Sequence, residues 1–129
     1  MIVNDGGKKM ELTKSELEIM DIFWEAGQPM SRGDLLAWAG DRNWKDSSIH
    51  ILMNGLLRKE AIRQVGVVRR SKTYGRTFLP NLSREAYYAE YLLSRPNPPQ
   101  VDGVIRELVS RSSMSAEELR PILQALTEE

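Results

Sequence analysis

The only histidine of the chain, His50, stands in a polar cluster that runs from Ser47 to Arg58. An imidazole beside serine hydroxyls could support acid–base or nucleophilic chemistry, but such a base needs a third group to orient it. No carboxylate is patterned to pair with His50, and the chain has no cysteine, no Gly-rich phosphate loop and no HExxH motif. We therefore expect no catalytic, metal or cofactor site, and we expect that the protein is not an enzyme.

The same side chains suit hydrogen bonding to bases and phosphates. Five apolar residues recur at the spacing of one buried helical stripe: Ile49, Leu52, Met53, Leu56 and Leu57. That stripe predicts a helix over residues 45–59 whose other face is left for DNA. The residues predicted to contact DNA from this helix are Lys45, Ser47, Ser48, His50, Ile51, Asn54 and Arg58. Ile51 is apolar, so two interpretations stay open: it packs at the edge of the core, or it touches a thymine methyl.

A basic hairpin is predicted directly after this helix. Residues 62–68 and 73–79 are rich in β-branched and aromatic types, which favours two strands. Residues 42–76 hold nine lysines and arginines against two acidic residues, although the net charge of the chain is zero. Such a concentration of positive charge is typical of a DNA-binding face. The hairpin residues predicted to contact DNA are Arg69, Arg70, Lys72, Tyr74 and Arg76.

The preceding segments predict the helices that must position this face. Thr13 and Glu16 form a capping-box pattern that starts a first helix, and Gly27 is a natural end for it. A short break at residues 28–30 leads to a second helix that stops at Gly40. The fold class that we predict is mostly α with a small antiparallel β wing. It comprises a winged helix-turn-helix DNA-binding domain and a C-terminal helical dimerisation region.

The last part of the chain is predicted to form three short helices with long apolar stripes. So few residues cannot bury these stripes alone, and a second copy of the chain is the natural partner. The residues predicted at this dimer interface are Tyr87, Tyr91, Val101, Ile105, Leu108, Leu119, Ile122, Leu123 and Leu126. Two alternatives stay open: the helices pack back onto the first part of the same chain, or the tyrosines line an effector site.

The predicted organisation has three parts: a flexible tail over residues 1–11, a DNA-binding domain over 12–82 and a dimerisation region over 83–129. The N-terminus lacks the apolar stretch of a secretory signal, and no apolar run approaches the roughly 20 residues of a membrane span. With the lack of cysteine, this pattern favours a cytoplasmic protein without membrane insertion. A winged-helix module that binds protein instead of DNA is the alternative function. Ile51 favours that alternative, whereas the arginines of the wing favour DNA.

Residues 12–80 resemble the penicillinase repressor family, which includes copper repressors. The resemblance lies in two motifs, Leu12-Thr-x-x-Glu16-x-Glu18-Ile19-Met20-x-x-Phe23-Trp24 and Trp44-x-x-Ser47-Ser48-Ile49-x-x-Leu52-x-x-x-Leu56-x-Arg58-Lys59. It implies a dimeric transcriptional repressor on a palindromic operator, with base-reading positions at Ser47, Ser48, His50 and Ile51. It also implies, for some members, inactivation by proteolysis downstream of a membrane sensor protease.

The sequence departs from the family pattern at several positions. Gly55 stands where members usually carry an arginine, so we expect a lost phosphate contact and a larger share of DNA affinity from the wing. Glu60 replaces a glycine at the turn before the wing. No Asn-Phe cleavage site is recognisable between Tyr91 and Val109, and the cysteines of the copper repressors are absent. The motifs therefore leave open whether β-lactams, copper or another signal acts on this protein.

Overall fold

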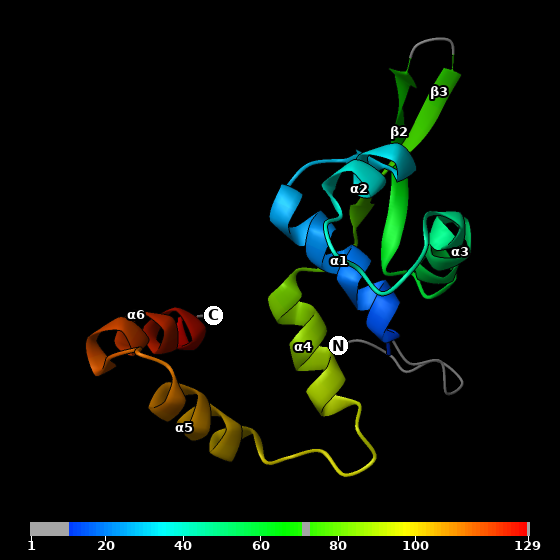
Figure 1. Cartoon of the computed structure of the whole chain (residues 1–129). Coiled ribbons are helices and arrows are strands. Elements are labelled where there is room, and N and C mark those ends of the chain that lie inside the picture. Colours follow the sequence, from blue (N-terminus) through cyan, green and yellow to red (C-terminus); the bar gives the residue numbers. More distant parts are fainter. Residues whose placement is uncertain (1–10, 71–72, 129) are drawn as a thin grey trace. The chain divides into compact units, whose positions relative to one another are not determined.

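The computed structural model describes residues 11–70 and 73–128 of the chain (Figure 1). It divides into two compact units, and the boundary between them in the sequence lies between Ser94 and Arg95. The first unit contains these elements: α1 (Lys14–Ala26), β1 (Met30–Ser31), α2 (Arg32–Trp38), the 3₁₀ turn η2 (Asp46–Ser48), α3 (Ile49–Arg58), β2 (Ile62–Arg70), β3 (Thr73–Pro80) and α4 (Arg84–Leu93). The second unit contains α5 (Val101–Arg111) and α6 (Ala116–Thr127). The tail predicted to be flexible lies outside the described residues, apart from Glu11.

Local capping fixes the first helix as the sequence predicts. The Thr13 side chain accepts a hydrogen bond from the Glu16 backbone N–H, and the Glu16 carboxylate accepts one from the Thr13 N–H. Gly27 ends α1 in the left-handed conformation, with φ of 64°, which a glycine adopts without strain. On the buried face of α1, Ile19, Met20 and Phe23 pack into the core.

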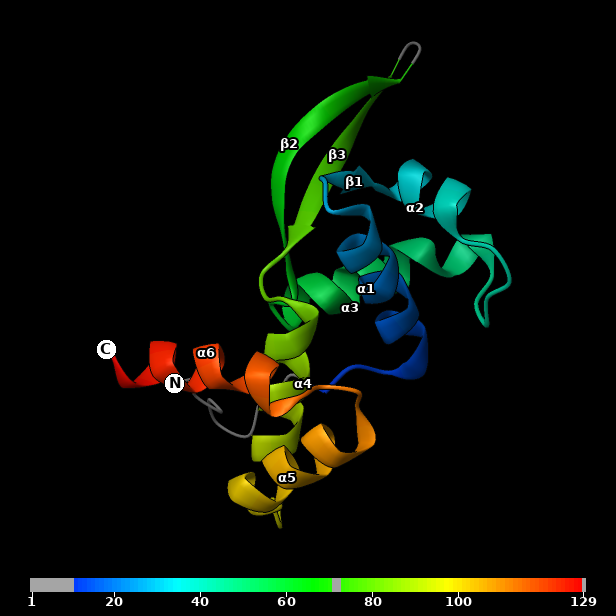
Figure 2. The same ribbon diagram turned by 90° about the vertical axis from the view of Figure 1, so that its left-hand side faces the viewer.

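The sheet has three antiparallel strands in the order β1-β3-β2, and so holds one strand more than the sequence indicated. The segment predicted as a simple break contains β1, in which Met30 pairs with Phe78 and Ser31 with Thr77. A register shift between Gln64 and Gly66 interrupts the β2–β3 ladder. Beyond this bulge the two strands form the wing, and Figure 2 shows the curved hairpin extending past the helices. The order of helices and the small sheet is that of a winged-helix fold.

The core lies between the three helices and the sheet. Its largest fully buried side chains are Phe23, Phe78, Ile19, Met20, Met30, Leu35, Met53 and Leu56. They come from α1, β1, α2, α3 and β3, so one core joins the helix-turn-helix to the base of the wing. Burial of this apolar surface therefore fixes how α3 is presented relative to β3.

The helix predicted over residues 45–59 begins less regularly than expected. Its first turn is the 3₁₀ turn η2, and regular α-helix starts only at Ile49. The C-terminal end is a Schellman motif, because the Ala61 N–H donates to the Leu56 carbonyl and the Glu60 N–H donates to the Leu57 carbonyl. Glu60 occupies the left-handed position of this motif with φ of 62°.

Helix α4 packs within the first unit, whereas the sequence grouped residues 83–94 with the dimerisation region. The Trp24 indole N–H donates to the Leu82 carbonyl at 2.9 Å, and the Trp24 and Tyr87 rings lie 6.0 Å apart. Arg84 forms an ion pair with Asp21 of α1 at 3.3 Å. These contacts hold the start of α4 against α1, and the first compact unit extends to Ser94.

The second unit consists of two capped helices. Ser115 and Glu118 form the predicted capping box at the start of α6, and Pro121 lies inside this helix. Neither helix has a buried residue. The contacts between α5 and α6 within this unit therefore leave their apolar stripes uncovered.

Candidate nucleic-acid interface

The outer face of α3 carries the side chains that the sequence assigns to DNA. His50, Asn54 and Arg58 are exposed, and Ile49, Met53 and Leu56 are buried on the opposite side. Lys45 and Ser47 are exposed at the start of the segment, and Ser48 is half-buried. The helical stripe thus separates the two faces as its spacing predicts.

Ile51 lies on this outer face. Its side chain is 75% exposed, so it is not packed at the edge of the core. Of the two interpretations that the sequence left open, the structure places the isoleucine where a groove contact is possible. An exposed apolar side chain of this size on a helix face is also compatible with a protein partner.

The loop before α3 is anchored by Trp44. This ring is 7% exposed and packs with the core, and the Arg42 guanidinium lies over it at 4.5 Å from the ring centre. Arg42 also donates to the Trp44 carbonyl at 3.1 Å and forms an ion pair with Asp46 at the start of η2. Asn43 bonds to Glu18 of α1. The segment that leads into α3 is therefore held to α1 and to η2.

The strand register of the wing places three predicted DNA-contact residues on one face of the hairpin: Arg69, Tyr74 and Arg76. Arg69 pairs with Tyr74 and Val67 pairs with Arg76, and opposed residues of an antiparallel ladder project to the same face. The Arg69 guanidinium lies 5.9 Å from the centre of the Tyr74 ring, which is 67% exposed. Arg70 ends β2 and its side chain lies outside the described part, as does Lys72.

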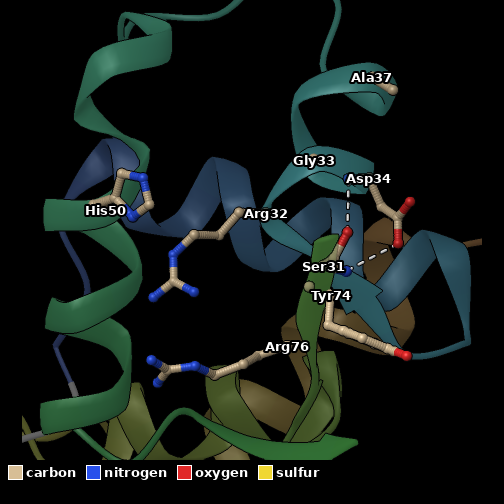
Figure 3. Close-up of a pocket in the computed structure, with 9 residues that line it drawn as sticks. Ser31, Arg32, Gly33, Asp34, Ala37, His50, Tyr74 and Arg76 are labelled. Atoms are coloured by element: carbon tan, nitrogen blue, oxygen red, sulfur yellow. Dashed lines mark hydrogen bonds between the residues drawn. The ribbon is translucent and has the colours of Figure 1, made fainter. Parts of the chain in front are cut away.

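A cleft of about 540 Å³ lies between α3 and the wing (Figure 3). It is lined by Ser31, Arg32 and Asp34 at the start of α2, by His50 of α3, and by Tyr74 and Arg76 of β3. In Figure 3 the guanidinium groups of Arg32 and Arg76 project into one space beside His50. The cleft therefore brings together His50 and Arg76, which the sequence assigned to DNA, and Arg32, which it did not.

Arg32 is held firmly at this cleft. Its guanidinium lies 5.2 Å from the centre of the buried Phe78 ring. The Arg32 Nε atom is buried and has no acceptor among the residues that the structure describes. Burial lowers the pKa of the Arg32 guanidinium below its usual value, and the nearby positive charge of Arg76 lowers it further. No sequence pattern marked Arg32, because a single arginine after a helix cap has no periodic or charge-cluster signal.

Gly55 does not lie on the DNA side of α3, which corrects an expectation from the sequence. The residue is buried, and a Cβ atom built on it would lie 2.5 Å from Oε2 of Glu16 in α1. A side chain at this position would start toward α1 and meet Glu16 first. This position therefore does not support the expectation that the glycine removes a phosphate contact, and a larger share of DNA affinity from the wing stays a prediction.

The residues predicted at a dimer interface fall into two groups. Tyr87 is buried against Trp24 inside the first unit and Tyr91 is half-buried beside it, 6.3 Å from ring to ring. In the second unit Leu119 is half-buried. The remaining six residues are exposed: Val101, Ile105, Leu108, Ile122, Leu123 and Leu126.

Comparison with known proteins shows the family to which the chain belongs. The sequence model of the penicillinase repressor matches residues 12–128, which includes both units. The chain belongs to the penicillinase repressor family. A comparison with curated proteins finds no match to this sequence. Among solved structures, Staphylococcus aureus MarR in complex with salicylate and kanamycin shares 14% sequence identity with this chain, with a TM-score of 0.40, and the match covers 90% of this chain and 69% of that one.

Membership confirms the resemblance that the two N-terminal motifs indicated, and extends it through α5 and α6. This penicillinase repressor family member is a winged-helix transcriptional regulator, and such regulators are not enzymes. Among the described residues, no group of three or more histidine, cysteine, aspartate or glutamate side chains could hold a metal ion. No helix in the described part of the chain is long and apolar enough to cross a membrane.

Proposed function

We propose that this family member represses transcription by binding a palindromic DNA operator as a homodimer in the cytoplasm. The observation that carries the proposal is the cleft of Figure 3, which is lined by His50 of α3 and by Tyr74 and Arg76 of the wing. The base-reading helix and the phosphate-contacting strands thus share one face of the unit. A duplex presents its major groove and flanking phosphates in the same juxtaposition.

Helix α3 and the wing would contact different parts of the DNA. The outer face of α3 would enter the major groove, which is about 12 Å wide, and there His50 and Asn54 would address base edges. The exposed Arg69 and Arg76 of the wing would contact phosphates, which contribute affinity without reading sequence. Ile51 would meet a thymine methyl.

The homodimer is proposed from the apolar stripes of the second unit. Six large apolar side chains of α5 and α6 are between 45% and 68% exposed. Burying such side chains stabilises an interface by roughly 25 cal/mol per Å² of apolar area. A second copy presents the same stripes, and a two-fold dimer places two recognition helices on two half-sites of a palindrome.

The proposal is tested by salt titration of duplex binding, measured by fluorescence anisotropy with a random duplex and with duplexes enriched from genomic fragments bound by the protein. If about four phosphates are neutralised per protomer, the slope of log K against log salt is about −7. Enriched fragments should contain an inverted repeat. Absence of duplex binding, or binding that does not change with salt, would overturn the proposal.

A protein-binding module is the alternative, and the exposed apolar side chains near the interface favour it. Ile51 is 75% exposed and Trp38 of α2 is 52% exposed. A protein partner would bury these side chains and would bind with little dependence on salt. In that case Ile51→Ser would abolish capture of the partner, and the same protein would not retard any duplex in a gel.

A further inference from the structure

We infer that the cleft between α2, α3 and β3 seats one phosphate of the DNA backbone, held jointly by Arg32 and Arg76. The inference rests on the proposed DNA-binding function and adds to it a contact residue, Arg32, on the helix before the recognition helix. The two arginines come from distant parts of the chain, and they engage the same phosphate instead of two separate ones.

The short strand β1 explains why the two arginines meet. Ser31 of β1 pairs with Thr77 of β3 in antiparallel register. The next pair of positions along that register is Arg32 and Arg76, which brings both side chains to the same edge of the cleft. Figure 3 shows their guanidinium groups directed into one space.

The electrostatics of the cleft favour an anion. Neither guanidinium forms an ion pair with a carboxylate in the part of the chain that the structure describes. Asp34 also lines the cleft, but its carboxylate accepts a hydrogen bond from the Ser31 backbone N–H at 2.9 Å, away from the two guanidinium groups (Figure 3). Two like charges without a counter-charge repel each other, and an oxyanion between them would remove that repulsion.

The donors in the cleft match a phosphate group. The planar guanidinium forks bind two oxygens of an oxyanion at once, which a lysine cannot do. The Arg32 Nε atom is buried, so the terminal nitrogens of the guanidinium, which Figure 3 shows directed into the cleft, would bind the oxyanion. Stacking on Phe78 holds Arg32 in place before binding. His50 also lines the cleft.

A free phosphate ion has the same chemistry as a phosphate of the backbone, and position favours the backbone. The cleft opens beside the exposed face of α3, whose His50 lines it, and the wing residues Tyr74 and Arg76 form its other side. A recognition helix in the major groove lies between two phosphate strands. The phosphate strand beside α3 would then pass over this cleft.

The test compares four variants of the full chain: Arg32→Met, Arg76→Met, the double variant, and Arg84→Met as a control. Methionine keeps an apolar stem of similar length on Phe78 and removes the charge. Arg84 pairs with carboxylates of α1 and does not line the cleft, so its variant controls for the loss of net charge. Thermal unfolding checks that each variant is folded. Affinity for an enriched operator is then measured across a series of salt concentrations.

If one phosphate is shared, the double variant lowers the magnitude of the salt slope by about 2 for a dimer, and each single variant lowers it by less than 1. The double variant should weaken binding at low salt by about 100-fold, from roughly 10-fold for each half-site. The losses of the single variants should not add up to the loss of the double variant. The Arg84 control should bind like the wild type.

Other results would overturn the inference. An Arg32→Met protein with wild-type affinity and slope would show that Arg32 does not contact DNA. A loss of slope near 4 in the double variant would show two separate phosphates. Saturable binding of inorganic phosphate to the DNA-free protein, lost in the double variant while operator binding is unchanged, would assign the cleft to a free anion. Absence of duplex binding by the wild type would instead overturn the proposed function, and this inference with it.

Discussion

Substitution of Gly55 by alanine tests how α3 packs on α1. The Cβ atom of the new residue would lie 2.5 Å from Oε2 of Glu16, too close for any real contact. Glu16 is 5% exposed and is tied at its other oxygen. Oε1 accepts hydrogen bonds from the Thr13 N–H at 2.9 Å and from Lys59 Nζ at 2.6 Å. The carboxylate therefore cannot make room without weakening the start of α1 and its ion pair to the end of α3.

Two effects of opposite sign decide the outcome. Alanine in a helix is favoured over glycine by about 1 kcal/mol. Displacing the carboxylate loses much of two hydrogen bonds to a charged group, each contributing about 1.5–3 kcal/mol when well buried. The Lys59 side chain is 24% exposed, so solvent screening reduces what its bond to Glu16 contributes to stability. The loss for the two bonds together is then about 2–3 kcal/mol. Gly55→Ala should then lower the free energy of unfolding by about 1–2 kcal/mol.

The sign should reverse once Glu16 is shortened. In a Glu16→Ala background the next atom near the new methyl is Nη2 of Arg58 at 3.8 Å, an ordinary contact. There Gly55→Ala should raise the free energy of unfolding by about 1 kcal/mol. Urea denaturation of the four proteins at one protein concentration measures the cycle, with an expected coupling of about 2–3 kcal/mol. Equal stabilisation by Gly55→Ala in both backgrounds would refute the packing of Gly55 on Glu16.

Four further predictions concern other parts of the molecule. Glu60→Gly should raise the free energy of unfolding by about 1 kcal/mol, since Glu60 has φ of 62°, and Glu60→Ala should not; chemical denaturation distinguishes them. Leu123→Asp should give monomers in sedimentation, and an intact dimer would exclude α6 from the interface. Arg69→Ala should weaken binding to all duplexes about equally and reduce the dependence of affinity on salt, because a phosphate contact is lost. Asn54→Ala should instead change the preference among operators. The opposite pattern would show that the helix contacts phosphates and the wing reads bases. Burial raises the pKa of Tyr87 above its ordinary 10.0. The neutral phenol therefore stabilises the fold fully below pH 10, and this stabilisation declines as pH rises from there toward the folded-state pKa. Tyr87→Phe should flatten this decline, which is measured by denaturation at a series of alkaline pH values.

Several features of the structure were accessible from the sequence because they depend on residues a few positions apart. The capping boxes at Thr13 and Ser115 and the left-handed Gly27 are set by hydrogen bonds within one helical turn. The spacing of apolar residues in α3 correctly separated its buried face from its outer face, since a helix of fixed pitch leaves no other arrangement. The alternation and residue types of the hairpin likewise predicted the wing strands to within about two residues at each end.

The remaining features depend on contacts between segments that are distant in sequence. Strand β1 exists only because Met30 and Ser31 pair with β3, and no two-residue stretch carries a strand signal of its own. That pairing, and not the local pattern, brings Arg32 to Arg76 and creates the cleft. Gly55 is required by Glu16 of another helix, so its meaning could not be inferred from α3 alone. In the same way, Tyr87 fits a dimer stripe by its spacing, but the ring of Trp24 buries it within its own chain. The sequence by itself determined which faces are apolar and where helices begin. Only tertiary packing decided which segment each face contacts, because that contact depends on the shape and charge of side chains from distant parts of the chain.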